Sequence, residues 1–267
     1  KTMTDLQAYM IVKDRLDEAE QYLNRSAMND DDNTSTLPED VSYATERYYS
    51  ALSWSSFLGQ NGKEFRIDKA ELMKSCLNKI SEAEEQFSYV DYLFRGILRD
   101  AQKGIDDAKQ SYKDGNYALC LYKATLTKAQ IGIVASSLGI RKDEVDQLLD
   151  RKLDAARKSI VTQQKNGIFP ILGYSYYEYS QSLRERDVYS SLLYSEYALE
   201  LSNLDIYFEP EKVSMTRIKS SDAVIFFSGF GLGGILMAVV IYLITKKKDT
   251  YRPGRPKHLD LKFNFKR

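Results

Sequence analysis

Residues that commonly perform catalysis or bind metal ions are scarce in this sequence. It contains one histidine, His258, and two cysteines, Cys76 and Cys120. Because His258 lies close to the C-terminal end, we expect neither a Ser-His pair, a Cys-His pair nor a zinc site in the rest of the chain. A Ser-Lys dyad stays open as an alternative, although no glycine-flanked serine stands out. The sequence therefore predicts no catalytic residue, no metal and no cofactor.

An excess of charge of one sign is also absent. The 38 Lys and Arg residues equal the 38 Asp and Glu residues, so no global basic surface indicates a nucleic-acid partner. Two cysteines are too few for a framework of disulfides. Two buried free thiols on separate helices are the simpler interpretation. A Cys76–Cys120 disulfide is the alternative if the domain lies outside the cell.

Long hydrophobic runs are missing, except for one near the C-terminal end. From Val224 to Thr245 the sequence has no charged residue. At a rise of about 1.5 Å per residue, this run covers the roughly 30 Å hydrocarbon core of a bilayer. We predict a transmembrane helix over residues 223–245, which makes membrane lipid a partner. Gly229 and Gly233 form a small-xxx-small face on this helix. Close packing of two such helices in a homo-oligomer is one interpretation of this face, and the general frequency of glycine in membrane helices is the other.

The charges that flank this run predict its orientation. The segment 209–222 is a juxtamembrane linker of mixed charge, whereas the tail, residues 246–267, is basic, with Lys246, Lys247 and Lys248 at its start and only Asp249 and Asp260 as acids. Because positive residues stay on the cytoplasmic side, we expect a cytoplasmic tail and an extracytoplasmic domain over residues 1–208 at the cell membrane. The chain begins with Lys1 rather than Met, so we expect it to be a processed piece of a longer product with an export signal.

The apolar residues of the predicted domain recur at helical spacing. One long amphipathic helix is predicted from the series Ile67, Leu72, Cys76, Leu77, Ile80, Ala83, Phe87, Val90, Phe94 and Ile97. Polar and glycine-containing breaks fall at residues 30–35, 59–62, 114–116, 139 and 166–170. No run alternates clearly enough to be a strand, so we expect about eight helices and essentially no sheet.

A weak internal repeat predicts how these helices pair. Residues 110–124 and 181–196 share the order of a helix, a tight polar turn and a second helix with small and aromatic residues, and a stretched third copy runs from residue 19 to residue 52. Tetratricopeptide-like hairpins have the same organisation. The copies are too irregular for a regular array, so the predicted fold is an all-α, irregular helical-hairpin bundle followed by one transmembrane helix.

Tyrosine is abundant, with 20 residues, and it clusters near residue 176. Helical spacing places Tyr174 and Tyr177 on one face, and Tyr176 and Tyr179 on another, so not all four can be buried together. Packing between helices is the first interpretation. A groove that binds a protein partner through these four tyrosines is the second, and it predicts that Tyr176 or Tyr179 is exposed.

The order of segments resembles the C-terminal region of archaeal membrane-anchored serine proteases with a Lon-type catalytic domain. The resemblance rests on Arg15-Leu16-Asp17-Glu18-Ala19-Glu20, Tyr43-Ala44-Thr45-Glu46-Arg47 with Trp54, Gly115-Asn116-Tyr117, Gly173 to Tyr179, Leu193 to Glu200, and the hydrophobic run with its lysines. It implies a Lon-type domain with a Ser-Lys dyad upstream. No catalytic residue carries over, because no such domain is present in this sequence.

These observations lead to one expected function and one alternative. The resemblance implies a non-catalytic, membrane-anchored module that anchors or presents substrates to an upstream protease domain of an archaeal surface protease. The alternative is an extracytoplasmic helical-repeat scaffold for protein–protein interaction, or a subunit of a surface or membrane assembly.

Overall fold

The structure, a computed structural model, describes residues 1–28 and 37–211. In these residues the chain forms eight α-helices, two short 3₁₀ helices and no β-strand, which confirms the prediction of an all-α domain. The helices are α1 (Met3–Met28), α2 (Leu37–Ser55), α3 (Lys69–Leu93), α4 (Arg99–Lys113), α5 (Tyr117–Ser137), η1 (Lys142–Glu144), α6 (Val145–Lys165), α7 (Ile171–Leu183), α8 (Val188–Ser202) and η2 (Leu204–Tyr207).

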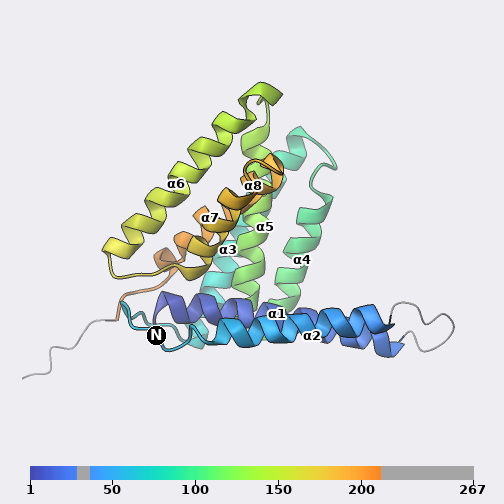
Figure 1. Cartoon of the computed structure of the whole chain (residues 1–267), viewed down its shortest axis with the longest axis vertical. Coiled ribbons are helices and arrows are strands. Elements are labelled where there is room, and N and C mark those ends of the chain that lie inside the picture. The colour runs from blue at the N-terminus through green and yellow to red at the C-terminus, as the bar shows by residue number, and fades with distance from the viewer. Residues whose placement is uncertain (29–36, 212–267) are drawn as a thin grey trace, which may run out of the picture. The chain divides into compact units, whose positions relative to one another are not determined.

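Three antiparallel hairpins organise the domain, and they coincide with the three copies of the predicted repeat. They are the pairs α1–α2, α4–α5 and α7–α8, each packed along its length. In Figure 1, α1 and α2 lie side by side across the lower ends of α3, α4 and α5. The turn between α4 and α5 contains Gly115, whose φ of 76° is a left-handed conformation that glycine adopts at little cost.

The central helix is α5, which contacts α1, α3, α4 and α8. Ten of its residues are buried, including the consecutive run from Ala118 to Tyr122. Because neighbouring helices pack against several sides of α5, its buried apolar residues are not confined to one stripe, and its Lys123 and Lys128 form ion pairs with carboxylates of neighbouring helices. Gly104 of α4 faces Thr127 of α5 so closely that a Cβ atom would clash. Close packing of α4 on α5 therefore requires this glycine.

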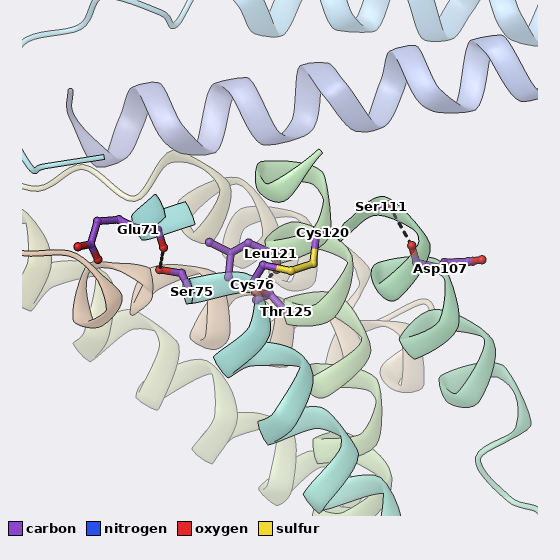
Figure 2. The surroundings of a disulfide bond; sticks show 8 residues. All are labelled: Glu71, Ser75, Cys76, Asp107, Ser111, Cys120, Leu121 and Thr125. Carbon is purple, nitrogen blue, oxygen red and sulfur yellow. Dashed lines mark hydrogen bonds between the residues drawn. A yellow bond between two sulfur atoms is a disulfide. The ribbon is translucent and has the colours of Figure 1, made fainter. Parts of the chain in front are cut away.

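Cys76 and Cys120 form a disulfide that joins α3 to α5 (Figure 2). The interpretation as two free thiols is wrong, because packing of α3 on α5 brings their Cα atoms to 5.7 Å, a separation typical of disulfides. Both cysteines are fully buried. Nearby, Ser75 and Thr125 donate their hydroxyl hydrogens to backbone carbonyls of their own helices, at 2.7 Å each, so these buried hydroxyls are satisfied.

The long helix predicted through Ile97 ends earlier than expected, at Leu93. Gly96 has a φ of 81° and donates its backbone N–H to the Asp91 carboxylate at 3.0 Å. This turn reverses the chain into α4 and leaves Phe94 and Ile97 about half exposed. The apolar spacing predicted a longer helix because the turn also contains hydrophobic residues. These residues are exposed, whereas those of the helix before the turn are partly buried.

Both ends of the described domain meet at the extended segment 63–67. Phe65 donates its backbone N–H to the Lys1 carbonyl at 2.8 Å, and Arg66 donates its own to the Glu209 carbonyl at 3.0 Å. The compact unit accordingly extends to Glu211.

No helix in the part of the chain that the structure describes is long and apolar enough to cross a membrane. The predicted transmembrane helix over residues 223–245 lies outside the described residues, as do the basic tail, Gly229 and Gly233.

Candidate binding groove

A groove of about 680 Å³ lies between α1, the connection from α2 to α3, and the first turn of α5. The connection is fastened to α1 by Asp5, whose carboxylate accepts the backbone N–H of Gly59 at 2.7 Å and that of Thr2 at 3.1 Å. Burial raises the pKa of Asp5, but these hydrogen bonds outweigh it and hold the pKa below its ordinary value. Asp5 is therefore a structural anion that shapes one wall.

Apolar side chains form much of the groove's lining, together with several charged groups. The apolar residues are Leu6, Tyr9, Leu58, Ile67, Leu72, Tyr117, Ala118 and Leu119. Pockets that bind ligands typically combine such a lining with a few polar groups that orient the ligand.

The lysines and carboxylates at the groove differ in what they already bind. Asp68 caps α3, because its carboxylate accepts the N–H groups of Ala70 and Glu71 at 2.9 Å each. Three lysines line the groove, Lys1, Lys13 and Lys69, and their side chains form no ion pair within the described residues; Lys69 lies 5.7 Å from the centre of the Tyr117 ring. Both carboxylates thus accept backbone amides, and Asp68 also lies 3.9 Å from the Arg66 guanidinium, whereas the three lysine side chains have no ion-pair partner within the described residues.

The first turn of α5 adds to the positive character of the groove. Residues 115–119 all line it, and the side chain of Asn116 makes no capping hydrogen bond to the helix. The first N–H groups of a helix have no partner within the helix and carry partial positive charge. Together with the three lysines, they make the groove suitable for an anionic ligand with apolar parts.

The four candidate tyrosines lie elsewhere, on α7, and the structure divides them between two faces. Tyr176 is half-buried and packs against Tyr194 and Tyr197 of α8, at centroid distances of 5.7 and 5.4 Å. Its hydroxyl lies 2.8 Å from the hydroxyl of the fully buried Tyr122. Tyr176 is therefore a packing residue, as the first interpretation predicted.

The other three tyrosines of α7 are less enclosed. Tyr179 is 48% exposed, with its ring edge-on to Tyr194 at 4.6 Å, and Tyr174 is 39% exposed. Tyr177 is half-buried against the apolar cluster around Leu149. The exposure expected for Tyr176 or Tyr179 is confirmed by Tyr179. A protein partner at this surface stays a prediction.

A cluster of charges lies beside the buried end of these tyrosines. Burial, together with the negative charge of Glu18, raises the pKa of Asp14 to about 6, and Arg15 and Lys123 oppose this only in part. The Asp14 carboxylate lies 3.6 Å from the Arg15 guanidinium. The pKa of Asp14 in the unfolded chain is near 3.8. Between about pH 4 and pH 6, Asp14 is therefore protonated in the folded state but ionised in the unfolded chain.

Asp14→Asn is therefore expected to stabilise the domain at pH 7.5 and to flatten its pH dependence. Stability of the wild type should fall as the pH rises from about 4 to about 6, because Asp14 must ionise while buried. The gain at pH 7.5 is on the order of 2 kcal/mol. Urea unfolding at pH 4.5 and 7.5 measures it, with the exposed Asp107→Asn as control. Equal stability of Asp14→Asn and wild type at pH 7.5 would contradict the argument.

A second group of charges, formed by α3, α5 and α8, surrounds Lys79. The Lys79 ammonium lies 3.2 Å from Glu82 and 3.1 Å from Glu200, and Lys128 lies 3.0 Å from each of the same carboxylates. Tyr207 donates its hydroxyl hydrogen to Glu82. Two positive and two negative groups neutralise one another here.

The groove was missed by sequence reasoning, because its walls come from segments far apart in the sequence. Asp5 to Gly59 and Lys69 to Tyr117 become neighbours only after α1, α3 and α5 have packed. The sequence predicted loops at two edges of the groove, at residues 59–62 and 114–116. It did not show that these two loops lie close together in the fold. No protein-family model, curated protein or solved structure matches the chain.

Proposed function

We propose that the chain is a non-catalytic, membrane-anchored helical module that binds anionic, partly apolar polypeptide segments in the groove between α1, α3 and α5. The observation that carries this proposal is the pairing of free lysines with an apolar lining, while the nearby carboxylates are held by backbone amides. The resemblance noted in the sequence supports the further proposal that it is the anchoring or substrate-presenting part of a Lon-like surface serine protease of archaea.

Two further observations support an extracytoplasmic location of the domain. Disulfides persist mainly in oxidising compartments, and the Cys76–Cys120 bond is buried within the domain. The basic residues that follow the hydrophobic run favour a cytoplasmic tail. Together they support a single-pass protein with residues 223–245 in the membrane.

The alternative is an extracytoplasmic scaffold or assembly subunit that acts without a protease. The hairpin architecture favours it equally, because stacked helical hairpins commonly present binding surfaces. The coding sequence upstream of Lys1 distinguishes the two functions: a Lon-type domain supports the first, and its absence supports the second.

The purified full chain is expected to bind fluorescein-labelled unfolded casein, an acidic polypeptide, without cleaving it. Lys69→Glu should weaken binding on the order of tenfold, because it replaces an attractive charge at the groove with a repulsive one. Fluorescence anisotropy measures binding, and gel electrophoresis of the same samples measures cleavage.

The matched control is Lys103→Glu, which makes the same charge change on an exposed position of α4 outside the groove. Both variants keep the α1 residues at the groove unchanged. Equal affinities of the two variants would rule out the groove as the binding site. Casein cleavage that a single Ser→Ala change abolishes would show that the module is an enzyme.

A further inference from the structure

The outer face of the α1–α2 hairpin is apolar and exposed. Six of its large side chains, three from each helix, are between 38% and 56% exposed: Tyr9, Leu16, Leu23, Val41, Tyr48 and Leu52. Between the two helices lies a groove of about 580 Å³. Apart from α1, α2 makes almost no contact with the described domain, so this face belongs to a hairpin that is covered on one side only.

The exposed residues of α1 follow the spacing of a helix-packing seam. Tyr9, Leu16 and Leu23 recur every seven residues, and Lys13 and Glu20 fall between them at steps of four and three. We call these five residues the outer stripe. A seven-residue repeat of apolar residues keeps one face of a helix against a partner helix along its length.

The two charges of the outer stripe have no ion-pair partner in the part of the chain that the structure describes. Neighbouring charges of α1 are paired: Arg15 with Glu18 at 2.6 Å, and Asp17 with Lys123 at 2.8 Å. Lys13 and Glu20 lie at equal distances in sequence from the midpoint between Leu16 and Asp17. A two-fold axis through this midpoint would place Lys13 of each copy opposite Glu20 of the other.

The same axis suits α2. Glu18 pairs with Arg47 at 3.2 Å, which fixes the register of the hairpin and places Tyr48 beside the midpoint of the outer stripe. The axis therefore passes close to Tyr48, and the apolar residues of α2 on either side of it would face those of the second copy. One symmetry operation thus matches the charges of α1 and the apolar residues of α2.

We propose that the outer face of the α1–α2 hairpin is an interface with a second copy of this chain, in which two hairpins form an antiparallel four-helix arrangement. Such an interface is isologous, since the same patch is used by both copies. It brings together two Lys13–Glu20 pairs and covers the apolar face of both hairpins. Because Tyr9 and Lys13 also lie at the border of the binding groove, Lys13 is paired in the dimer, and Lys1 and Lys69 are the groove lysines that remain for an anionic ligand. A partner with charge of only one sign would leave either Lys13 or Glu20 facing an apolar or like-charged surface.

Leu16→Cys tests the geometry, because residue 16 lies next to the proposed axis. In the full chain in detergent micelles, mild oxidation should convert most of this variant into a covalent dimer, whereas Lys103→Cys on α4 should stay monomeric. The native cysteines are bonded to each other and buried, so they do not compete. Absence of the Leu16→Cys dimer, or equal cross-linking of both variants, would overturn the proposal.

Charge reversal tests the pairing independently of the predicted transmembrane helix. In the Leu16→Cys background, Lys13→Glu and Glu20→Lys should each lower the yield of covalent dimer severalfold, because each creates two like-charge contacts across the axis. The double reversal, Lys13→Glu with Glu20→Lys, should restore the yield to within about twofold of the parent, since opposite charges again face each other. The proposal would also be overturned if the single reversals left the yield of covalent dimer unchanged, or if the double reversal failed to restore that yield.

Discussion

Replacing both cysteines with alanine is expected to lower the free energy of unfolding of the domain by about 2–4 kcal/mol. The Cys76–Cys120 disulfide closes a loop with a sequence separation of 44 residues. It therefore restricts the unfolded chain strongly, and the chain-entropy account gives about 4 kcal/mol for a loop of this length. It also joins α3 to the central helix α5, so its loss should be felt across the main core.

Urea denaturation at neutral pH measures the change, with wild type in reducing agent as the matched control. Reduced wild type loses the cross-link but keeps both sulfur atoms in the core. The difference in free energy of unfolding between reduced wild type and the double alanine variant therefore isolates the cost of removing the buried sulfur volume. Equal stability of reduced and oxidised wild type would contradict the argument. So would mass-spectrometric detection of two free thiols in protein that was folded under oxidising conditions.

The helical class of the domain, its approximate number of helices and the three hairpins followed from spacing and turn residues. These features depend on neighbours in sequence, such as the Asp114–Asn116 turn that links α4 to α5. The end of α3 at Leu93 did not follow, because an exposed apolar turn has the same composition as a buried helix. The local sequence pattern shows which residues are apolar, but it does not show whether another helix packs over them.

The disulfide and the binding groove depend on contacts between distant segments. Nothing in the sequence places Cys76 beside Cys120. With only two cysteines, the choice between a disulfide and two free thiols depends on whether the domain lies in an oxidising compartment. The density of tyrosines on α7 indicates an aromatic surface but not which rings are exposed, and Tyr176 packs between helices. The free lysines of the groove, by contrast, resemble any solvated charge until the positions of the nearby carboxylates are known.

Lys79→Met is expected to lower the free energy of unfolding by about 3–5 kcal/mol, the typical cost of removing one partner of a buried ion pair. The side chain of Lys79 is 3% exposed and its ammonium contacts both Glu82 and Glu200. Without it, these two carboxylates share the single positive charge of Lys128. Lys128→Met is the matched control: it removes the same charge from the same carboxylates, but at a side chain that is 24% exposed, so water can replace more of its effect.

The pH dependence of this loss gives a second, independent readout. Burial raises the pKa of Glu82, but the hydrogen bond from Tyr207 and the charges of Lys128 and Lys79 outweigh it and lower the pKa to about 2, below its unfolded value of 4.5. Glu82 therefore contributes stability above about pH 4.5, and this contribution is lost as the pH falls toward 2. In Lys79→Met the pKa of Glu82 rises, because one of the charges that lowers it is gone.

The stability difference between Lys79→Met and wild type should consequently shrink as the pH is lowered from 7 to 3, since Glu82 becomes protonated in the variant while it stays ionised in the wild type. Adding Glu200→Gln to Lys79→Met should recover part of the loss at pH 7, because it removes the uncompensated charge, and a double-mutant cycle measures this coupling. If Lys79→Met costs less than about 1 kcal/mol at pH 7, the range typical of exposed ion pairs, then Lys79 is not held as a buried ion pair in solution.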